Sequence, residues 1–153
     1  MNLRTISLLR ALAAVFIAAA LLMMPSACSN DNLIDQVPQP ISQFIAQYFP
    51  GYGVGQYEHT ATGYHIRLKN GPGMNFDASY AWENIDGYGL PIPQVFLFDQ
   101  TPPKLYSYLQ GMSELNQVFS IARNSSTYTL TLLDSSISYD IAHQEITSNT
   151  LTN

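Results

Sequence analysis

The sequence predicts an α+β domain made of two tandem helix-plus-antiparallel-strand repeats, which form one sheet with both helices packed on one face. Three observations predict it: an apolar stripe at helical spacing, short strand-like segments separated by turn residues, and the return of both patterns 64 residues later. Each repeat would have one apolar helix face and one apolar sheet face. Helices packed on one side of a continuous sheet bury both.

An apolar stripe that ends at Pro50-Gly51 predicts the first helix. Pro38 and Pro40 fall in its first turn, where a missing N–H costs little because those donors have no partner within the helix. The stripe consists of Ile41, Phe44, Ile45, Tyr48 and Phe49.

Four strand-like segments follow the helix. Thr62-Gly63 marks the first reversal, and Asn70-Gly71 is the favoured pair for a two-residue hairpin turn because both central positions need positive φ. Pro72 cannot donate the closing hydrogen bond, so we expect a wider turn. The segments are residues 54–60, 64–69, 74–77 and 80–85.

The same order of patterns returns in the second half of the chain. Thr101 is a plausible N-cap of the second helix, with Pro102 after it. A one-residue slip then aligns Phe76-Asp77 with Tyr139-Asp140. Pairs separated by 64 residues are Pro38 and Pro102, Ile41 and Leu105, Phe44 and Tyr108, Ile45 and Leu109, Val54 and Val118, Tyr64 and Tyr128, and Leu68 and Leu132.

These patterns set the expected organisation of the chain. The polar segment after the only cysteine is expected to be a tether. The expected parts are a lipoprotein-type signal peptide (1–27), a tether (28–36), the domain (37–148) with repeat one at about 37–86, a connection at 87–100 and repeat two at about 101–146, and a tail (149–153).

The N-terminus reads as an export signal. Arg4 and Arg10 precede an uncharged apolar run from Ala11 to Met24, which is shorter than the roughly 20 residues that a membrane-spanning helix needs. Pro25-Ser26-Ala27-Cys28 resembles the site cut by lipoprotein signal peptidase, apart from Pro25, where leucine is usual. Cys28 would then carry lipid. The alternative is a soluble periplasmic protein cut after Ala27, with a free thiol at Cys28.

Charge excludes one class of partner. After the signal peptide, four basic and eleven acidic side chains leave a net charge of −7. Nucleic acid would need clustered Lys and Arg, and the sequence has no basic stripe, so no nucleic-acid partner is expected.

The sequence gives little sign of catalysis. His59, His65 and His143 form no metal motif, and the serines lack a nucleophile-elbow motif. Asp77 and Asp140 occupy equivalent positions after an aromatic residue, where Asp commonly accepts N–H bonds in a turn. We therefore expect no enzyme, no catalytic residue, no metal site and no cofactor.

Aromatic residues are the distinctive feature, with ten Tyr, seven Phe and one Trp. Tyr and Trp give rigid contact area at low entropic cost, so a cluster on an open sheet face would be a recognition surface. The apolar segment Val95 to Phe98 either packs under the second helix or across the sheet edge, or forms a partly exposed patch. The candidate partner-binding residues are Tyr80, Trp82, Tyr88, Phe96 and Phe98.

With these residues placed, the chain resembles the beta-lactamase-inhibitor-like, PepSY-like family of small envelope proteins over residues 37–146. The resemblance implies a two-repeat α+β fold, export, and a role in binding or inhibiting another protein. It weakens in the second repeat, where the Asn-Gly turn is absent and no Trp follows Tyr139-Asp140. It rests on Phe44 to Pro50, Gly63-Tyr64, Leu68 to Gly71, Phe76-Asp77, Ala81 to Gly87 and Leu90 to Pro93.

The leading hypothesis is a lipid-anchored envelope binding module. Its sheet face would hold a protein or peptide partner of unknown identity and inhibit or restrain that partner. The alternative is a non-inhibitory structural or assembly component of the cell envelope. Ser29 is not a typical inner-membrane retention residue, which favours the outer membrane.

Overall fold

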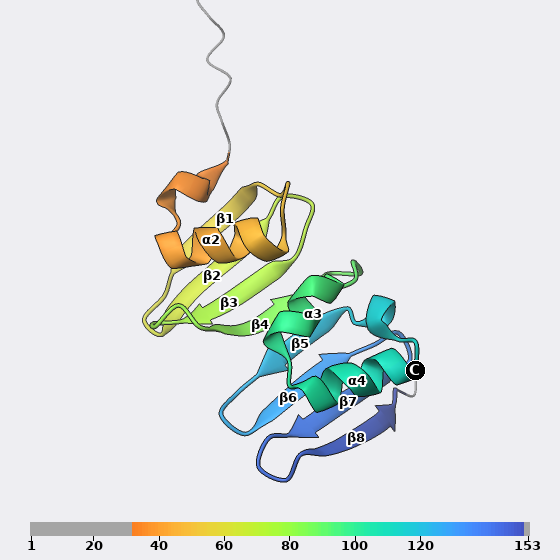
Figure 1. The fold of residues 1–153 in the computed structure, drawn as a ribbon. Helices are drawn as coiled ribbons and strands as arrows, with labels where there is room; N and C mark the ends of the chain where they lie inside the picture. Colours follow the sequence, from red (N-terminus) through yellow and green to blue (C-terminus); the bar gives the residue numbers. More distant parts are fainter. Residues whose placement is uncertain (1–31, 152–153) are drawn as a thin grey trace, which may run out of the picture. The chain divides into compact units, whose positions relative to one another are not determined.

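The chain folds into an α+β domain, seen in a computed structural model that describes residues 32–151. The predicted signal peptide and Cys28, the predicted site of lipidation, lie outside these residues. The described part contains three α-helices, two short 3-10 helices and one antiparallel sheet of eight strands (Figure 1). No helix among residues 32–151 is long and apolar enough to cross a membrane.

The elements of the first half match the predicted helix and four strands closely. Pro38 is the N-cap of the helix and Pro40 lies in its first turn, and the N–H of Phe49 donates to the carbonyl of Ile45 at its end. The elements are η1 (Leu33–Gln36), α2 (Gln39–Tyr48), β1 (Val54–His59), β2 (Gly63–Leu68), β3 (Gly73–Asp77) and β4 (Trp82–Asp86).

The second half contains a helix that the sequence did not predict. Residues 94–100, expected to be a connection, form α3 ahead of the predicted second helix, α4. The elements are α3 (Gln94–Gln100), α4 (Pro103–Gly111), η2 (Leu115–Gln117), β5 (Ser120–Arg123), β6 (Thr127–Thr131), β7 (Ser135–Asp140) and β8 (Glu145–Thr150).

The sheet is a simple meander, because each strand pairs antiparallel with the next along the chain. The turn after β2 is wider than two residues, as Pro72 predicted: the N–H of Leu68 donates to the carbonyl of Pro72, and Asn70 has a φ of 53°. The fourth strand begins at Trp82, not Tyr80, because Tyr80 lies in the preceding turn with a φ of 68°.

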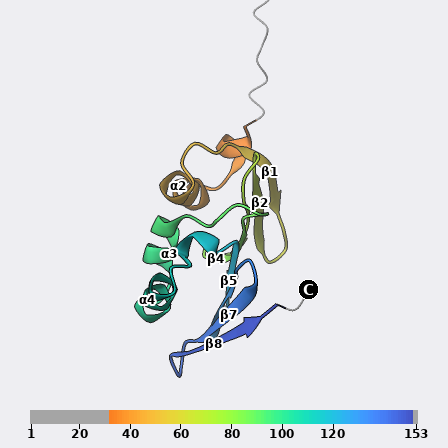
Figure 2. The same cartoon turned by 90° about the vertical axis from the view of Figure 1, so that its right-hand side faces the viewer.

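Helices and core lie on one side of the sheet. Figure 2 shows α2, α3 and α4 on the same side of the strands. One row of paired residues runs from β2 to β7 across this face and is buried in every strand. The row consists of Ile66, Met74, Ile85, Ile121, Leu130 and Ile137.

Phe96 of α3 is the centre of an aromatic cluster in this core. It is fully buried, and its ring centroid lies 5.5 Å from that of Tyr48 and 5.1 Å from that of Trp82. Leu97 is buried beside it, whereas Val95 is 50% exposed and Phe98 is 65% exposed. The segment from Val95 to Phe98 is therefore amphipathic. Part of it is exposed, as one expectation had it, but the buried Phe96 packs against the first helix and β4, and not under the second helix or across the sheet edge.

Three sequence predictions about boundaries are wrong. Thr101 is not an N-cap: it is the C-cap of α3, and its Oγ1 donates to the carbonyl of Leu97 at 2.6 Å, while Pro102 is the N-cap of α4. Residues 33–36, predicted to belong to the tether, form η1, which packs on the domain, and Asn32 Oδ1 accepts the N–H of Val54. The last strand reaches Thr150, inside the predicted tail.

Positions 64 residues apart have matching burial. Ile41 and Leu105 are fully buried on their helices, and Leu68, at the end of β2, and Leu132, directly after β6, are also buried. The slipped pair, Phe76 and Tyr139, is also buried. The tandem repeat itself stays a prediction.

Replacing Phe96 with Ala should lower the free energy of unfolding by about 3–5 kcal/mol, because it removes a buried ring and leaves a cavity. The exposed neighbour Val95, changed to Ala, is the matched control and should change stability by less than about 0.5 kcal/mol. Urea unfolding followed by tryptophan fluorescence measures both. Equal losses for the two variants would contradict the central position of Phe96.

Candidate binding surface

The face of the sheet opposite the helices is uncovered among residues 32–151 (Figure 2). Successive residues of a strand point to opposite faces of the sheet, so rows of paired residues alternate between the core side and this side. The strand register places two such rows on this side. Neither row contains a large apolar side chain. The first row is Gln56, Arg67, Gly73, Asp86, Ser120, Thr131, Ser136 and Asn149; the second is Glu58, His65, Asn75, Asn84, Ala122, Thr129, Ser138 and Thr147. We call this surface the open face.

Arg67 and Tyr88 form a pair on the open face. The guanidinium carbon of Arg67 lies 3.4 Å from the centroid of the Tyr88 ring, a close cation–π contact. Arg67 makes no ion pair and no side-chain hydrogen bond with residues of the described part. Its N–H donors are thus held in a fixed plane and are free to bind an acceptor from a partner.

The backbone around Tyr88 holds its ring against the sheet. The N–H of Tyr88 donates to Asp86 Oδ1 at 2.8 Å, and Tyr88 has a φ of 50°, which is uncommon for a residue with a side chain. Gly73 leaves space beneath the ring, since a Cβ there would lie 2.9 Å from Tyr88 Cε2. Strain of this kind is often retained where a side chain must be held for function.

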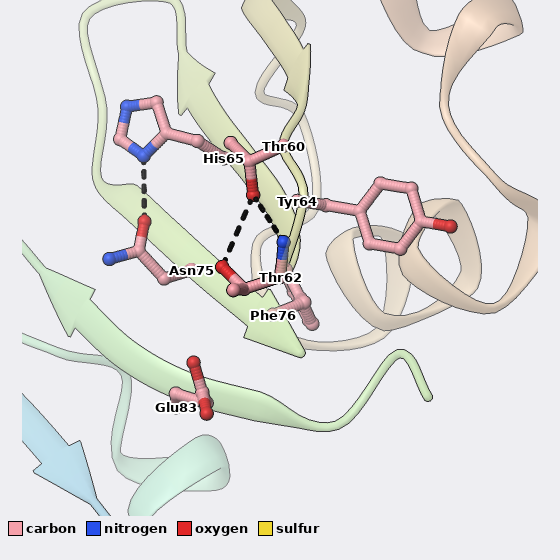
Figure 3. A pocket seen from close by; sticks show the side chains of 7 residues that line it. All are labelled: Thr60, Thr62, Tyr64, His65, Asn75, Phe76 and Glu83. Atoms are coloured by element: carbon pink, nitrogen blue, oxygen red, sulfur yellow. Dashed lines mark hydrogen bonds between the residues drawn. The ribbon is translucent and has the colours of Figure 1, made fainter. Parts of the chain in front are cut away.

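A polar hollow of about 230 Å³ lies at the end of the open face beside the turn between β1 and β2 (Figure 3). His65 Nδ1 and Asn75 Oδ1 are 2.7 Å apart, and Thr60 Oγ1 donates to the carbonyl of Gly63. Glu83 from β4 lines the other side. The lining residues offer both hydrogen-bond donors and hydrogen-bond acceptors, so the hollow suits polar side chains of a partner.

The five predicted partner-binding residues do not form one surface. Trp82 is 3% exposed, and its Nε1 donates to Gln100 Oε1 at 2.9 Å, so it belongs to the core together with Phe96. Phe98 is exposed and belongs to α3, a helix that lies on the helix side of the sheet (Figure 2). Tyr80 lies in a turn, and only Tyr88 lies on the open face. The aromatic sheet face predicted from the sequence is wrong, because the large rings were needed to fill the space between helices and sheet.

Arg67 is the functional candidate that sequence reasoning missed. Its position was predictable, because His65 and Arg67 alternate with the apolar Tyr64, Ile66 and Leu68 and must point away from the core. Its stacking on Tyr88 was not predictable, because the two residues are brought together only by the pairing of β2, β3 and β4.

A second aromatic group lies at the outer end of β1 and β2, on the helix side. The rings of His59 and Tyr64 stack at 4.6 Å, and those of Tyr64 and Tyr80 stack at 5.2 Å. The hydroxyl of Tyr80, partial burial and the nearby Tyr57 raise the pKa of Tyr64. The raised pKa keeps the Tyr64 hydroxyl protonated, and the rings of the group contribute stacking contacts.

Asp77 and Asp140 serve as turn acceptors. Asp77 Oδ1 accepts from the N–H and the Oγ of Ser79 and from the N–H of Ala81, at 2.7–2.9 Å. Asp140 Oδ1 accepts from the N–H of His143 at 2.7 Å and lies 3.0 Å from His143 Nδ1. Their separate turns do not bring the two carboxylates together for acid–base chemistry. Within residues 32–151, no three His, Cys, Asp or Glu side chains lie together to hold a metal ion.

Solved structures with the same fold come from Bacteroides. A "putative periplasmic protein from DUF2874 family" of Bacteroides vulgatus is 20% identical, with a TM-score of 0.62, and the match covers 76% of this chain and 93% of that one. A "putative calcium-regulated periplasmic protein" of Bacteroides thetaiotaomicron is 22% identical, with a TM-score of 0.64 and the same coverage. This chain shares their fold.

The comparisons go no further than the fold. No family model matches the chain, so its resemblance to the beta-lactamase-inhibitor-like, PepSY-like family stays a prediction. No curated protein matches it.

The turn at Asp77 predicts a pH dependence of stability. The Ser79 hydroxyl and the backbone N–H groups of Ala81 and Ser79 hold the pKa of Asp77 below its ordinary value. The charged carboxylate therefore stabilises the fold at pH values above the pKa of the unfolded chain, and this contribution is lost as the pH falls through the lowered pKa. Asp77→Asn should lower the urea midpoint at pH 7 and reduce its fall on acidification.

Asp134→Asn is the matched control, because the Asp134 side chain makes no hydrogen bond with the described residues. The same urea titrations at pH 7 and at acidic pH apply to both variants. If the urea midpoint of Asp77→Asn falls on acidification as much as that of the parent chain, the Asp77 carboxylate is not the cause of the pH dependence.

Proposed function

We propose that the chain is an exported, non-catalytic binding domain of the bacterial envelope that holds a protein partner on the open face of its sheet. The observation that carries the proposal is the Arg67–Tyr88 pair on a sheet face that no described helix covers. Arg and Tyr dominate the binding energy of protein interfaces. A stacked Arg has lost part of its conformational freedom before binding, which lowers the entropic cost of capturing a partner.

The chemistry of the open face supports a protein partner. Ser, Thr, Asn and Gln side chains provide adaptable hydrogen bonds around the Arg67–Tyr88 pair, a combination typical of protein-recognition surfaces. The only Lys or Arg in the two rows is Arg67. A carboxylate or a carbonyl of the partner is its natural acceptor, because the planar guanidinium can donate two parallel N–H bonds.

The proposal includes the two-repeat architecture. Two copies of one helix-and-strand unit would place α2 and α4 on the same side of the sheet, and the matching burial 64 residues apart supports this. Under this proposal the fold is that of the beta-lactamase-inhibitor-like, PepSY-like proteins, and the partner is an envelope enzyme that the domain inhibits or restrains. An inhibitor fold alone does not make an inhibitor, so the partner must be found by experiment.

Export and anchoring complete the proposal. The signal-like N-terminus and the descriptions of its structural neighbours as periplasmic support export. Lipid on Cys28 would hold the domain at the outer membrane through acyl chains, each buried CH₂ contributing about 0.8 kcal/mol.

A specific observation favours the alternative, an assembly component of the envelope. Phe98 lines a shallow hollow between α3 and α4 and is 65% exposed, on the helix side. An assembly component would pack this side against a neighbour and leave the open face free. The remaining lining residues are Pro103, Tyr106, Ser107 and Gln110.

Site-specific photocrosslinking in the cells that make the protein separates the two functions. A photoreactive amino acid at Thr129 or Ser138 samples the open face, and one at Gln47 or Gln110 samples the helix side. We expect the same discrete adduct from both open-face positions and none from the helix-side positions. Adducts from Gln110 but not from Thr129 would contradict the open-face proposal and support the assembly component.

Once the adduct is identified, Arg67→Ala and Tyr88→Ala should each weaken binding of the purified partner roughly tenfold or more, as expected for interface hot spots. Phe98→Ala is the matched control, because it removes an exposed aromatic ring from the other side of the sheet. Unchanged affinity in both open-face variants would remove the Arg67–Tyr88 pair from the interface.

A further inference from the structure

The last strand, β8, is an edge strand whose outer side is not covered by any of residues 32–151. It pairs with β7 over six consecutive residue pairs without a bulge, so its other side presents unpaired N–H and C=O groups in the described structure. Five of its six residues are exposed, and only Ile146 is partly buried. It contains no Pro, Lys or Arg, and its only charge is Glu145, at its start.

The opposite edge strand, β1, is protected in several ways. A register shift lies between Val54 and Gln56, and the N–H of Val54 is bonded to the side chain of Asn32 at 2.8 Å. The 3-10 helix η1 packs against this strand. Bulges, covering segments and charges are the usual means by which proteins prevent edge strands from pairing. The contrast indicates that β8 is left open for pairing.

We propose that β8 pairs antiparallel with β8 of a second copy of this chain, about a two-fold axis perpendicular to the sheet. Unpaired backbone donors and acceptors in a regular row are complementary to another extended strand and to little else. A strand of six residues supplies a contact about 20 Å long.

Symmetry favours a second copy as the occupant. Pairing of β8 with β1 of another chain would be head-to-tail and would continue into open-ended fibres, and the protected β1 edge opposes it. Pairing of β8 with β8 uses the same surface on both chains and closes after two. This assembly is therefore the one that the two edges jointly permit.

Charge along β8 also permits self-pairing. With Ser148 on the axis, Glu145 of one chain lies opposite Leu151 of the other, and the two Glu145 residues are about 20 Å apart. This exceeds the screening length of roughly 8–10 Å at physiological salt. The only charged residue of β8 therefore has no like charge directly opposite it in this pairing.

Because the two-fold axis is perpendicular to the sheet, corresponding faces of the two chains lie on the same side of the joined sheet. The helices of both chains would lie on one face of the joined sheet, and the two open faces would be continuous across β8. The proposal rests on the sheet edge and stands whether or not the open face binds a partner.

Cysteine crosslinking tests the pairing in the full-length chain, expressed with its own signal sequence in the bacterial envelope. Cysteine is introduced singly at Thr147, Ser148 or Asn149 on β8, and, as matched controls on the other edge, at Gln56 or Glu58 on β1. All five side chains are exposed. In an antiparallel pair about a two-fold axis, one residue lies opposite itself at a Cα–Cα distance of about 4.5–5.5 Å, which suits a disulfide.

After mild oxidation, we expect disulfide-linked dimers from one of the three β8 positions, at least about tenfold above the β1 positions and above the parent chain with Cys28 alone. Mass spectrometry should find the bond between the introduced cysteine and its own copy. Dimers at no β8 position would overturn the proposal. A disulfide from β8 to a different protein would also overturn it, because the occupant would then be another protein's strand.

Discussion

The packing of Phe96 between the first helix and the centre of the sheet is the contact on which the rest of the domain depends. Its ring lies within about 6 Å of the rings of Phe44, Tyr48, Phe49 and Trp82. The next turn of α3 adds polar links: Gln100 accepts from Trp82 Nε1 and donates to the Tyr48 hydroxyl. Because α3 belongs to the connection between the halves, these contacts join α2 to β4, the strand that pairs with the second half.

The same packing explains why the open face is polar. Large aromatic and aliphatic side chains form one buried core, and the three helices lie on a single side of the strands (Figure 2). With the apolar residues placed there, strand alternation leaves Ser, Thr, Asn and charged residues on the other side. Under the proposed function, recognition there would depend on hydrogen bonds and on one stacked arginine, with little aromatic area beyond Tyr88.

Local patterns in the sequence were enough to predict α2, the strands of the first half and the wide turn at Pro72. The helix α3 was missed because its run Val95 to Phe98 is too short to show a helical period, and because Thr101 and Pro102 suggested that a helix began there. Trp82 and Phe96 were assigned to a binding surface because a sequence does not show which side of a strand or short helix receives the core. Arg67 had an outward position that alternation predicts, but its partner Tyr88 comes from a loop beyond β4.

The central claim is that both halves form one cooperative sheet, so that the open face is a single rigid surface. Native-state hydrogen exchange tests this directly, by comparing the opening free energies of the slowest amides in β2 and β3 with those in β6 and β7. The account predicts that both sets converge on one value, equal to the global free energy of unfolding, and decrease together as urea is added. Two separate values, with one half opening while the other stays protected, would contradict it.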